Sequence, residues 1–149
     1  MYKNCIKRII DIILSLIIFI PLMLIVLIFG IFIKVEDKGP IFYCGNRLGM
    51  NKKVFRMYKL RSMKLNAPDL RNDDGTTFNS DNDPRLLKIG SFIRKTSIDE
   101  LPQIINVLKG DMSFIGPRPD LDSQIVYYEN SDKDQAKFLV KPGNWICSM

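Results

Sequence analysis

A stretch of 22 residues without a charged side chain, residues 12–33, constrains the fold of this chain more than any other feature. With a rise of about 1.5 Å per residue, a helix of this length reaches roughly 33 Å, which matches the hydrocarbon core of a bilayer. A cleaved signal peptide is the alternative, but its apolar region is about 7 to 15 residues long and ends at small residues. Here Lys34-Val35-Glu36-Asp37 follows the run. We therefore expect residues 1–38 to form a membrane anchor.

Pro21 lies near the middle of this apolar run. A proline inside a helix removes a backbone donor and bends the helix, although membrane helices tolerate it. Basic residues flank the run on both sides: Lys3, Lys7 and Arg8 precede it, and Lys34, Lys38 and Arg47 follow it. Because Lys and Arg concentrate on the cytoplasmic side of a membrane, both flanks are predicted to lie there. The pattern favours a re-entrant helix, broken at Pro21, and leaves a straight spanning helix as the alternative.

The remaining residues, 39–149, are polar enough to form a cytosolic domain beside the membrane. The chain has a formal charge of +6, carried mainly by this part, so anionic lipids, a phosphorylated substrate or nucleic acid are the expected partners. Three cysteines without a CxxC pair argue against a zinc site or a disulfide framework. Histidine is absent, so any catalysis must use carboxylates, cations or a hard metal ion.

The expected fold class is α+β, predominantly helical, with one short β-hairpin. An extended segment at 41–44, a turn at 49–51 and a strand at 54–63 predict the hairpin. Between residues 41 and 65 there are seven basic residues and no acidic one: Arg47, Lys52, Lys53, Arg56, Lys59, Arg61 and Lys64. Residues 69–84, rich in Asp, Asn, Gly and Pro, predict a mobile lid or a disordered connection.

Two helices are expected in the second half of the chain. From Ile98 the apolar residues recur at helical spacing, and Gly110 stands where that helix would end. Ser97 and Glu100 have the spacing of a capping box. A second helix is predicted over residues 121–140.

Asp99 and Glu100 lie at the expected start of the Ile98 helix. Acidic residues are common in first turns, where they cap free amides, and spacing alone favours this structural role. The functional alternative is that the same amides keep Asp99 ionised, as a nucleophile or a Mg²⁺ ligand must be. Neighbouring residues on a helix do not face one another, so the two carboxylates are expected to have different roles.

Four basic residues are candidates for binding phosphate. Arg118 lies between two prolines that fix its backbone, which suits bidentate phosphate binding, although a plain rigid turn has the same sequence. Lys59 and Arg61 are two residues apart, so on a strand they share a face and can meet a diphosphate. Solvated surface charge or lipid contact is the alternative for both. Arg94, five residues before Asp99, is placed near the mouth of the same helix.

The order of these segments resembles the monotopic bacterial phosphoglycosyl transferases, the initiating sugar transferases of polyprenyl-phosphate pathways. The similarity begins at Lys7-Arg8-Ile9-Ile10-Asp11 and ends at Lys141-Pro142-Gly143. Between them lie the blocks Asn46-Arg47-Leu48-Gly49, Tyr58-Lys59-Leu60-Arg61-Ser62-Met63, Ile93-Arg94-Lys95-Thr96-Ser97-Ile98-Asp99-Glu100-Leu101-Pro102-Gln103, Asn106-Val107-Leu108-Lys109-Gly110-Asp111-Met112-Ser113 and Gly116-Pro117-Arg118-Pro119. Several long blocks in the family's order make the functional role of Asp99 the favoured one.

The resemblance implies a monotopic enzyme on the cytosolic face of the bacterial inner membrane. Asp99 would attack the sugar-bearing phosphate of a UDP-sugar, release UMP and hold the phospho-sugar until undecaprenyl phosphate takes it, which initiates capsule, O-antigen, exopolysaccharide or glycoprotein glycan synthesis. Glu100 would assist the acceptor or the metal, Mg²⁺ would bind Asp99 and the diphosphate, and Arg94 and Arg118 would hold phosphate oxygens. Membrane lipids are expected partners.

Two departures from the family pattern stand out. The family breaks its membrane helix at a Ser-Pro pair, where this chain has Ile20-Pro21. Family members also continue after the Lys-Pro-Gly block with an Ile-Thr-Gly-Trp-like sequence, so residues 39–149 are expected to be a catalytic domain that is incomplete at its C-terminus. A non-catalytic, nucleotide-sugar-binding remnant is the alternative function. A nucleic-acid binder that stacks bases on Phe55 and Tyr58 is disfavoured by the ordered blocks.

Overall fold

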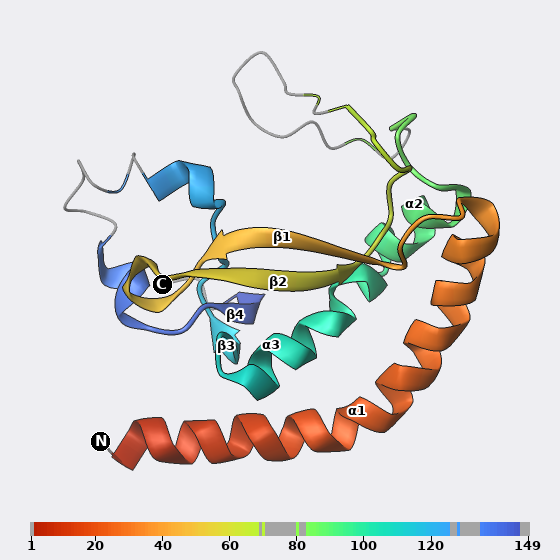
Figure 1. Ribbon diagram of the computed structural model, residues 1–149. Helices are drawn as coiled ribbons and strands as arrows, with labels where there is room; N and C mark the ends of the chain where they lie inside the picture. The colour runs from red at the N-terminus through yellow and green to blue at the C-terminus, as the bar shows by residue number, and fades with distance from the viewer. Residues whose placement is uncertain are drawn as a thin grey trace.

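The computed structural model of the protein describes residues 2–68, 70, 80, 83–125, 128 and 135–146. Most of the predicted acidic loop 69–84, and Cys147, lie outside the described residues. A small α+β domain packs against one long helix, which runs along the lower edge of Figure 1 and then up its right side. The expected α+β class, with more helix than strand, is confirmed.

Helix α1 spans Tyr2–Glu36 and continues through Pro21 without interruption. Figure 1 shows that α1 is bent between its two halves, as expected for a helix that contains a proline. Most of its large apolar side chains are exposed on the protein, among them Ile17, Ile20 and Leu24. The helix is therefore long and apolar enough to cross a membrane, on the criteria of length and composition.

The predicted hairpin is confirmed. Strand β1 (Phe42–Leu48) pairs antiparallel with β2 (Val54–Leu60), and a 3-10 turn at Met50–Lys52 joins them. Asn51 in that turn has a φ of 56°, a conformation that Asn tolerates better than most residues. Strand β1 is longer than expected and β2 ends before Arg61.

Three short helical segments follow in the chain: α2 (Lys88–Lys95), a 3-10 helix (Ile98–Gln103) and α3 (Ile104–Lys109). The sequence pattern did not indicate α2. The helix expected from Ile98 begins as a 3-10 helix and becomes α-helical only at Ile104. Gly110, with a φ of 92°, ends α3 as predicted.

Strands β3 (Ser113–Gly116) and β4 (Gly143–Ile146) form a parallel pair. Of the helix predicted over residues 121–140, the described residues Ile125 and Tyr128 are α-helical, whereas Asp122–Gln124 and Gln135–Leu139 form 3-10 turns, so the prediction is confirmed only in part. Residues 126–127 and 129–134 of that prediction lie outside the described residues.

The elements are stacked in the order α1, α3, β2, β1. Arg8 of α1 donates to the Val107 and Leu108 carbonyl oxygens at the end of α3. Asn106 of α3 accepts from the Tyr58 N–H at 3.0 Å and donates to the Arg56 carbonyl at 2.7 Å on the edge of β2. Two apolar clusters fill the spaces between elements: Ile33, Leu60, Leu87 and Ile93 in one, and Phe55, Met57, Val107 and Met112 in the other. Strand β1 is thus the layer farthest from the first half of α1 (Figure 1).

Candidate active site

Asp99 and Glu100 lie in the first turn of the 3-10 helix Ile98–Gln103. Ser97 before them has a φ of 57° and its side chain makes no capping hydrogen bond, so the predicted capping box is wrong. In the left-handed conformation, Ser97 closes the turn through its backbone instead, since its carbonyl accepts from the Glu100 N–H at 3.1 Å. The Glu100 carboxylate is therefore directed to other side chains.

Lys59 on β2 contacts both carboxylates. Its Nζ lies 2.8 Å from Glu100 Oε1 and 3.9 Å from Asp99 Oδ2. On the opposite side, Arg118 Nη2 lies 3.7 Å from the same Glu100 oxygen, and 70% of the Arg118 side chain is exposed. The structure thus brings together four of the predicted site residues from three separate parts of the chain.

The charge of Asp99 is under opposing influences. Only 9% of the residue is exposed. Burial, and secondarily the like charge of Glu100, raises the pKa of Asp99 above its ordinary value of 3.8, while Lys59 and Arg94 act in the opposite direction. The backbone hydrogen bond lowers this pKa, as expected of helix amides, but burial outweighs it, so the net shift is upward; the ionised state of Asp99 stays a prediction. A carboxylate with a raised pKa is more basic, which suits a nucleophile.

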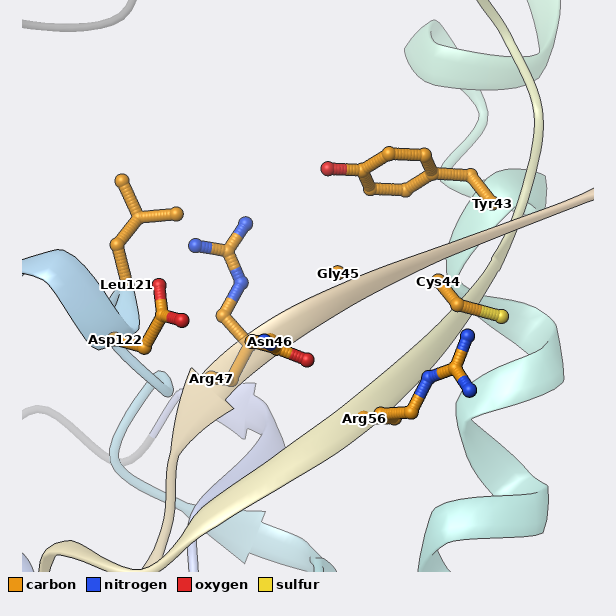
Figure 2. A pocket seen from close by; sticks show the side chains of 8 residues that line it. All are labelled: Tyr43, Cys44, Gly45, Asn46, Arg47, Arg56, Leu121 and Asp122. Carbon is orange, nitrogen blue, oxygen red and sulfur yellow. The ribbon is translucent and has the colours of Figure 1, made fainter.

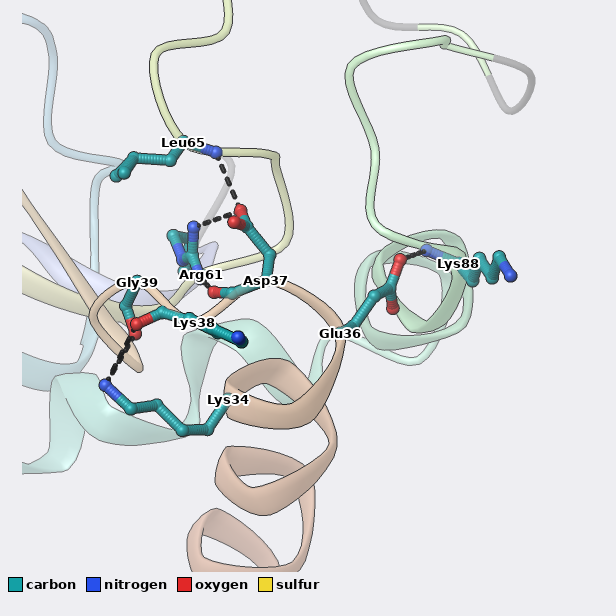
Figure 3. A network of polar contacts seen from close by, with 8 residues as sticks. All are labelled: Lys34, Glu36, Asp37, Lys38, Gly39, Arg61, Leu65 and Lys88. Carbon is teal, nitrogen blue, oxygen red and sulfur yellow. Dashed lines mark hydrogen bonds and ion pairs between the residues drawn. The ribbon is translucent and has the colours of Figure 1, made fainter.

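Arg94 and Arg61 are placed differently. Arg94, half-buried near the end of α2, acts electrostatically on both Asp99 and Asp83. Arg61 instead pairs with Asp37, just beyond α1: its Nη1 lies 2.6 Å from Asp37 Oδ2, and its Nη2 donates to the Asp37 carbonyl (Figure 3). In the structure Arg61 fastens the end of α1 to the end of β2, and phosphate binding by this residue stays a prediction.

A cavity of about 450 Å³ adjoins Glu100. Its charged and polar lining comprises Arg47, Lys59, Ser97, Glu100, Gln103, Arg118, Asp120 and Gln124. The sequence placed Arg47 in the basic patch, in the basic flank of the apolar run and in a family block, but did not predict its position in this cavity. Arg47 pairs with Phe55 and therefore projects from the same face of the hairpin as Lys59, a relation that follows from the strand period of two only once the register is known.

Comparison with known proteins decides the family. The family model described as bacterial sugar transferase matches residues 2–145 of the chain. The chain belongs to the bacterial sugar transferase family. The resemblance noted in the sequence is thereby confirmed over almost the whole chain.

Relatives of this chain carry names that describe related reactions. The galactosyl transferase CpsE of Streptococcus agalactiae is 46% identical over 115 residues, which are 72% of this chain. The UDP-N-acetylgalactosamine-undecaprenyl-phosphate N-acetylgalactosaminephosphotransferase of Aeromonas hydrophila is 41% identical over 145 residues, 93% of this chain. The UDP-glucose:undecaprenyl-phosphate glucose-1-phosphate transferase of Escherichia coli is 41% identical over 142 residues, 95% of this chain. The chain spans only 25%, 32% and 30% of the lengths of these three proteins, respectively.

A metal ion remains a prediction for this member of the family. Among the described residues, no group of three or more His, Cys, Asp or Glu side chains comes together. Mg²⁺, however, is commonly held by one or two carboxylates together with substrate phosphates. The neighbouring carboxylates of Asp99 and Glu100 fit that kind of site, in which the substrate supplies the remaining oxygen ligands.

Proposed function

We propose that this family member transfers a sugar 1-phosphate from a UDP-sugar to undecaprenyl phosphate and releases UMP. The observation that carries the proposal is the convergence of Asp99, Glu100, Lys59 and Arg118, in which two carboxylates are set among basic side chains and all but Asp99 line one cavity. Such a site suits a diphosphate substrate because cations bind its oxygens while a carboxylate attacks phosphorus. The names of two relatives, which combine a UDP-sugar with undecaprenyl phosphate, support the same substrate pair.

In the first step, a carboxylate oxygen of Asp99 attacks the sugar-bearing phosphorus. The bond from that phosphorus to the bridging oxygen breaks, and its electron pair leaves with UMP. Arg94 and Arg118 bind phosphate oxygens during this step, and Lys59 keeps Asp99 and Glu100 oriented while it offsets their negative charge. The product is a phospho-sugar bonded to Asp99.

In the second step, a phosphate oxygen of undecaprenyl phosphate attacks the same phosphorus. The bond to Asp99 breaks, and Asp99 is restored as a carboxylate. Glu100 assists by accepting a proton from an acceptor that arrives protonated. When bound by Asp99 with the diphosphate, Mg²⁺ supplies charge neutralisation at the reacting phosphates.

We further propose that α1 is re-entrant and places this site on the cytosolic face of the membrane. Its first turns are tied to the domain by Lys7, which donates to the Ile115 carbonyl at 2.9 Å, and by Arg8 at the end of α3. Its last turn is tied to the same domain by Glu36, which accepts from the Lys88 N–H at 2.6 Å (Figure 3). A helix with both ends fastened to one polar domain cannot place those ends on opposite sides of a bilayer.

Turnover tests the proposed reaction directly. The protein is reconstituted in lipid nanodiscs that contain undecaprenyl phosphate and supplied with Mg²⁺ and a panel of UDP-sugars, and UMP release is measured. We expect UMP release with at least one donor, and sustained release only when the acceptor lipid is present. If the protein binds UDP-sugars but releases no UMP from any of them, it is a binding protein and the proposed reaction is wrong.

A further inference from the structure

Arg47 faces the candidate active site from strand β1. In the antiparallel register Tyr43 lies opposite Lys59 and Arg47 opposite Phe55. Cross-strand partners project from the same face, and residues two or four apart on one strand do so as well. Arg47 therefore shares a face of the hairpin with Lys59, and both line the cavity beside Glu100.

Arg47 differs from the other basic residues of that cavity in having no carboxylate partner. Lys59 pairs with both acidic residues of the site and Arg118 pairs with Glu100. No carboxylate within the described part of the chain lies within ion-pair distance of Arg47. The Nε of Arg47 is buried and finds no hydrogen-bond partner among the same residues. A half-buried guanidinium without an ion pair, and with an unbonded Nε, costs desolvation free energy, which a bound anion offsets.

Arg47 and Arg118 also act on each other. Burial first, and the nearby positive charge of Arg118 as a further cause, lower the pKa of Arg47, although the guanidinium stays protonated. The charges of Asp122 and Asp120 act in the opposite direction, although neither carboxylate lies within ion-pair distance of Arg47 and Asp120 is already bound by Tyr128 and Lys137. The contacts therefore give an order along the cavity of Lys59, Glu100, Arg118 and Arg47, with a guanidinium that makes no ion pair to any described residue at the Arg47 end.

A second cavity of about 450 Å³ continues beyond Arg47 at the outer edge of β1. Figure 2 shows the Arg47 guanidinium between Leu121 and Asp122 on one side and Tyr43 on the other. Arg47 and Leu121 line both cavities, so the two cavities meet at these side chains. A ligand whose phosphates lie beside Lys59 and Arg118 thus has room to extend past Arg47.

We propose that Arg47 is a further donor-binding residue, whose guanidinium binds the phosphate of a nucleoside diphosphate that leaves with the nucleoside. The inference rests on the proposed use of a UDP-sugar. Lys59 and Arg118 then serve the sugar-bearing phosphate, and Arg118 and Arg47 serve its neighbour. One diphosphate between the two guanidinium groups relieves their mutual repulsion and satisfies the buried Nε.

The stacking of the elements favours a nucleotide over the phosphate of the lipid acceptor. Arg8 ties α1 to α3, Asn106 ties α3 to β2, and β1 lies beyond β2. Arg47 is therefore in the layer farthest from the first half of the membrane helix (Figure 1). A soluble nucleotide reaches this position from water, whereas a lipid phosphate arrives from the side of α1.

Binding of UDP, which lacks a sugar to transfer, tests the proposal without turnover. Titration calorimetry in nanodiscs compares the wild type with Arg47→Lys, Arg47→Gln and Lys53→Gln. Lys53 is the matched control, because it is an exposed basic residue just before the neighbouring strand β2 and lines neither cavity. Arg47→Gln and Lys53→Gln remove the same charge, so a general electrostatic effect would weaken both equally. Thermal unfolding of each variant confirms that it is folded.

We expect Arg47→Lys to raise the Kd for UDP about tenfold, because a point charge replaces a fork that binds two oxygens, and Arg47→Gln to raise it further. Lys53→Gln should stay within about twofold of the wild type. Unchanged UDP affinity in Arg47→Lys and Arg47→Gln, equal losses in the two Gln variants, or a wild type that does not bind UDP would each overturn the proposal. A higher KM for undecaprenyl phosphate with normal UDP binding would assign Arg47 to the acceptor and also overturn it. UDP binding without UMP release from any UDP-sugar would refute the proposed reaction alone.

Discussion

At the scale of single residues, Asp99 combines burial with a cationic neighbour. Burial raises its pKa, and Lys59 at 3.9 Å limits that rise. Glu100 shares Lys59 at 2.8 Å and adds a like charge beside Asp99. The two adjacent carboxylates are therefore in different environments, as different roles require: Asp99 is buried with a raised pKa, and Glu100 is more exposed and stays available to the acceptor or a metal ion.

Lys59 and Glu100 act in opposite directions on the pKa of Asp99, so removing one charge or the other is predicted to shift the pH profile of the reaction in opposite directions. Formation of the Asp99 phospho-sugar needs the ionised carboxylate, so its rate falls as the pH drops through the raised pKa of Asp99. Lys59→Met removes a charge that lowers this pKa, so the acidic limb of the profile should move to higher pH. Glu100→Gln removes a charge that raises it, so the limb should move to lower pH. Single-turnover rates over a pH series give the midpoints, and shifts in the same direction would contradict the assignment.

Arg118 is expected to act through its geometry as well as its charge. Arg118→Lys keeps the positive charge but replaces a two-pronged guanidinium by an ammonium, so UMP release should fall by about tenfold. The side chain is 70% exposed, so this variant should fold normally. Arg56→Lys, the same exchange on an exposed position of β2, serves as the control. A wild-type rate in Arg118→Lys would place Arg118 outside the site.

At the scale of elements, Asn106 joins α3 to the edge of β2. It is fully buried, and its side-chain amide bonds the Tyr58 N–H and the Arg56 carbonyl. Asn106→Ala leaves both backbone groups without this partner, which should lower the free energy of unfolding by roughly 2 to 4 kcal/mol. Asn46→Ala, on an exposed position of β1, should change it by less than about 0.5 kcal/mol. Equal losses in the two variants, measured by denaturant titration in detergent, would contradict this role.

The elements that local sequence determines were predictable, and those that depend on distant contacts were not. The hairpin 42–60 follows from a turn between two extended segments, and Gly110 ends α3 because glycine adopts a positive φ without strain. Strands β3 and β4 are four residues each and pair in parallel across 26 intervening residues, so neither is recognisable alone. Helix α2 has no side-chain cap of its own, and Glu36 of α1 supplies its N-terminal acceptor.

The residues of the candidate site show the same division between what local sequence predicts and what depends on distant contacts. The family blocks identified Asp99, Glu100, Arg94 and Arg118, and strand spacing identified Lys59. Spacing also paired Arg61 with Lys59, yet Arg61 follows the end of β2, where Asp37 from a distant part of the chain binds it. The position of Arg47 in the cavity was not predicted, because its relation to Lys59 depends on the register of the hairpin, which the sequence does not define to the residue.

At the scale of the whole molecule, both ends of α1 are fastened to the domain, so residues before and after the apolar run should face the cytosol. Cys5 precedes the run and Cys44 follows it. In a Cys147→Ser background, a membrane-impermeant maleimide should label both cysteines in inside-out vesicles and neither in intact spheroplasts. Labelling in detergent first shows that each thiol is reachable, since Cys44 is half-buried. Cys5 labelled only from the periplasm, with Cys44 labelled only from the cytosol, would establish a spanning helix instead.

The central claim is that Asp99 carries the phospho-sugar, and intact-mass spectrometry tests it most directly. The protein is incubated with Mg²⁺ and a UDP-sugar, without the acceptor lipid, and the adduct is located by peptide mapping. The wild type should gain the mass of one phospho-sugar on the peptide that contains Asp99, Asp99→Asn should gain none, and undecaprenyl phosphate should discharge the adduct. An adduct of the same mass that persists in Asp99→Asn would contradict the claim.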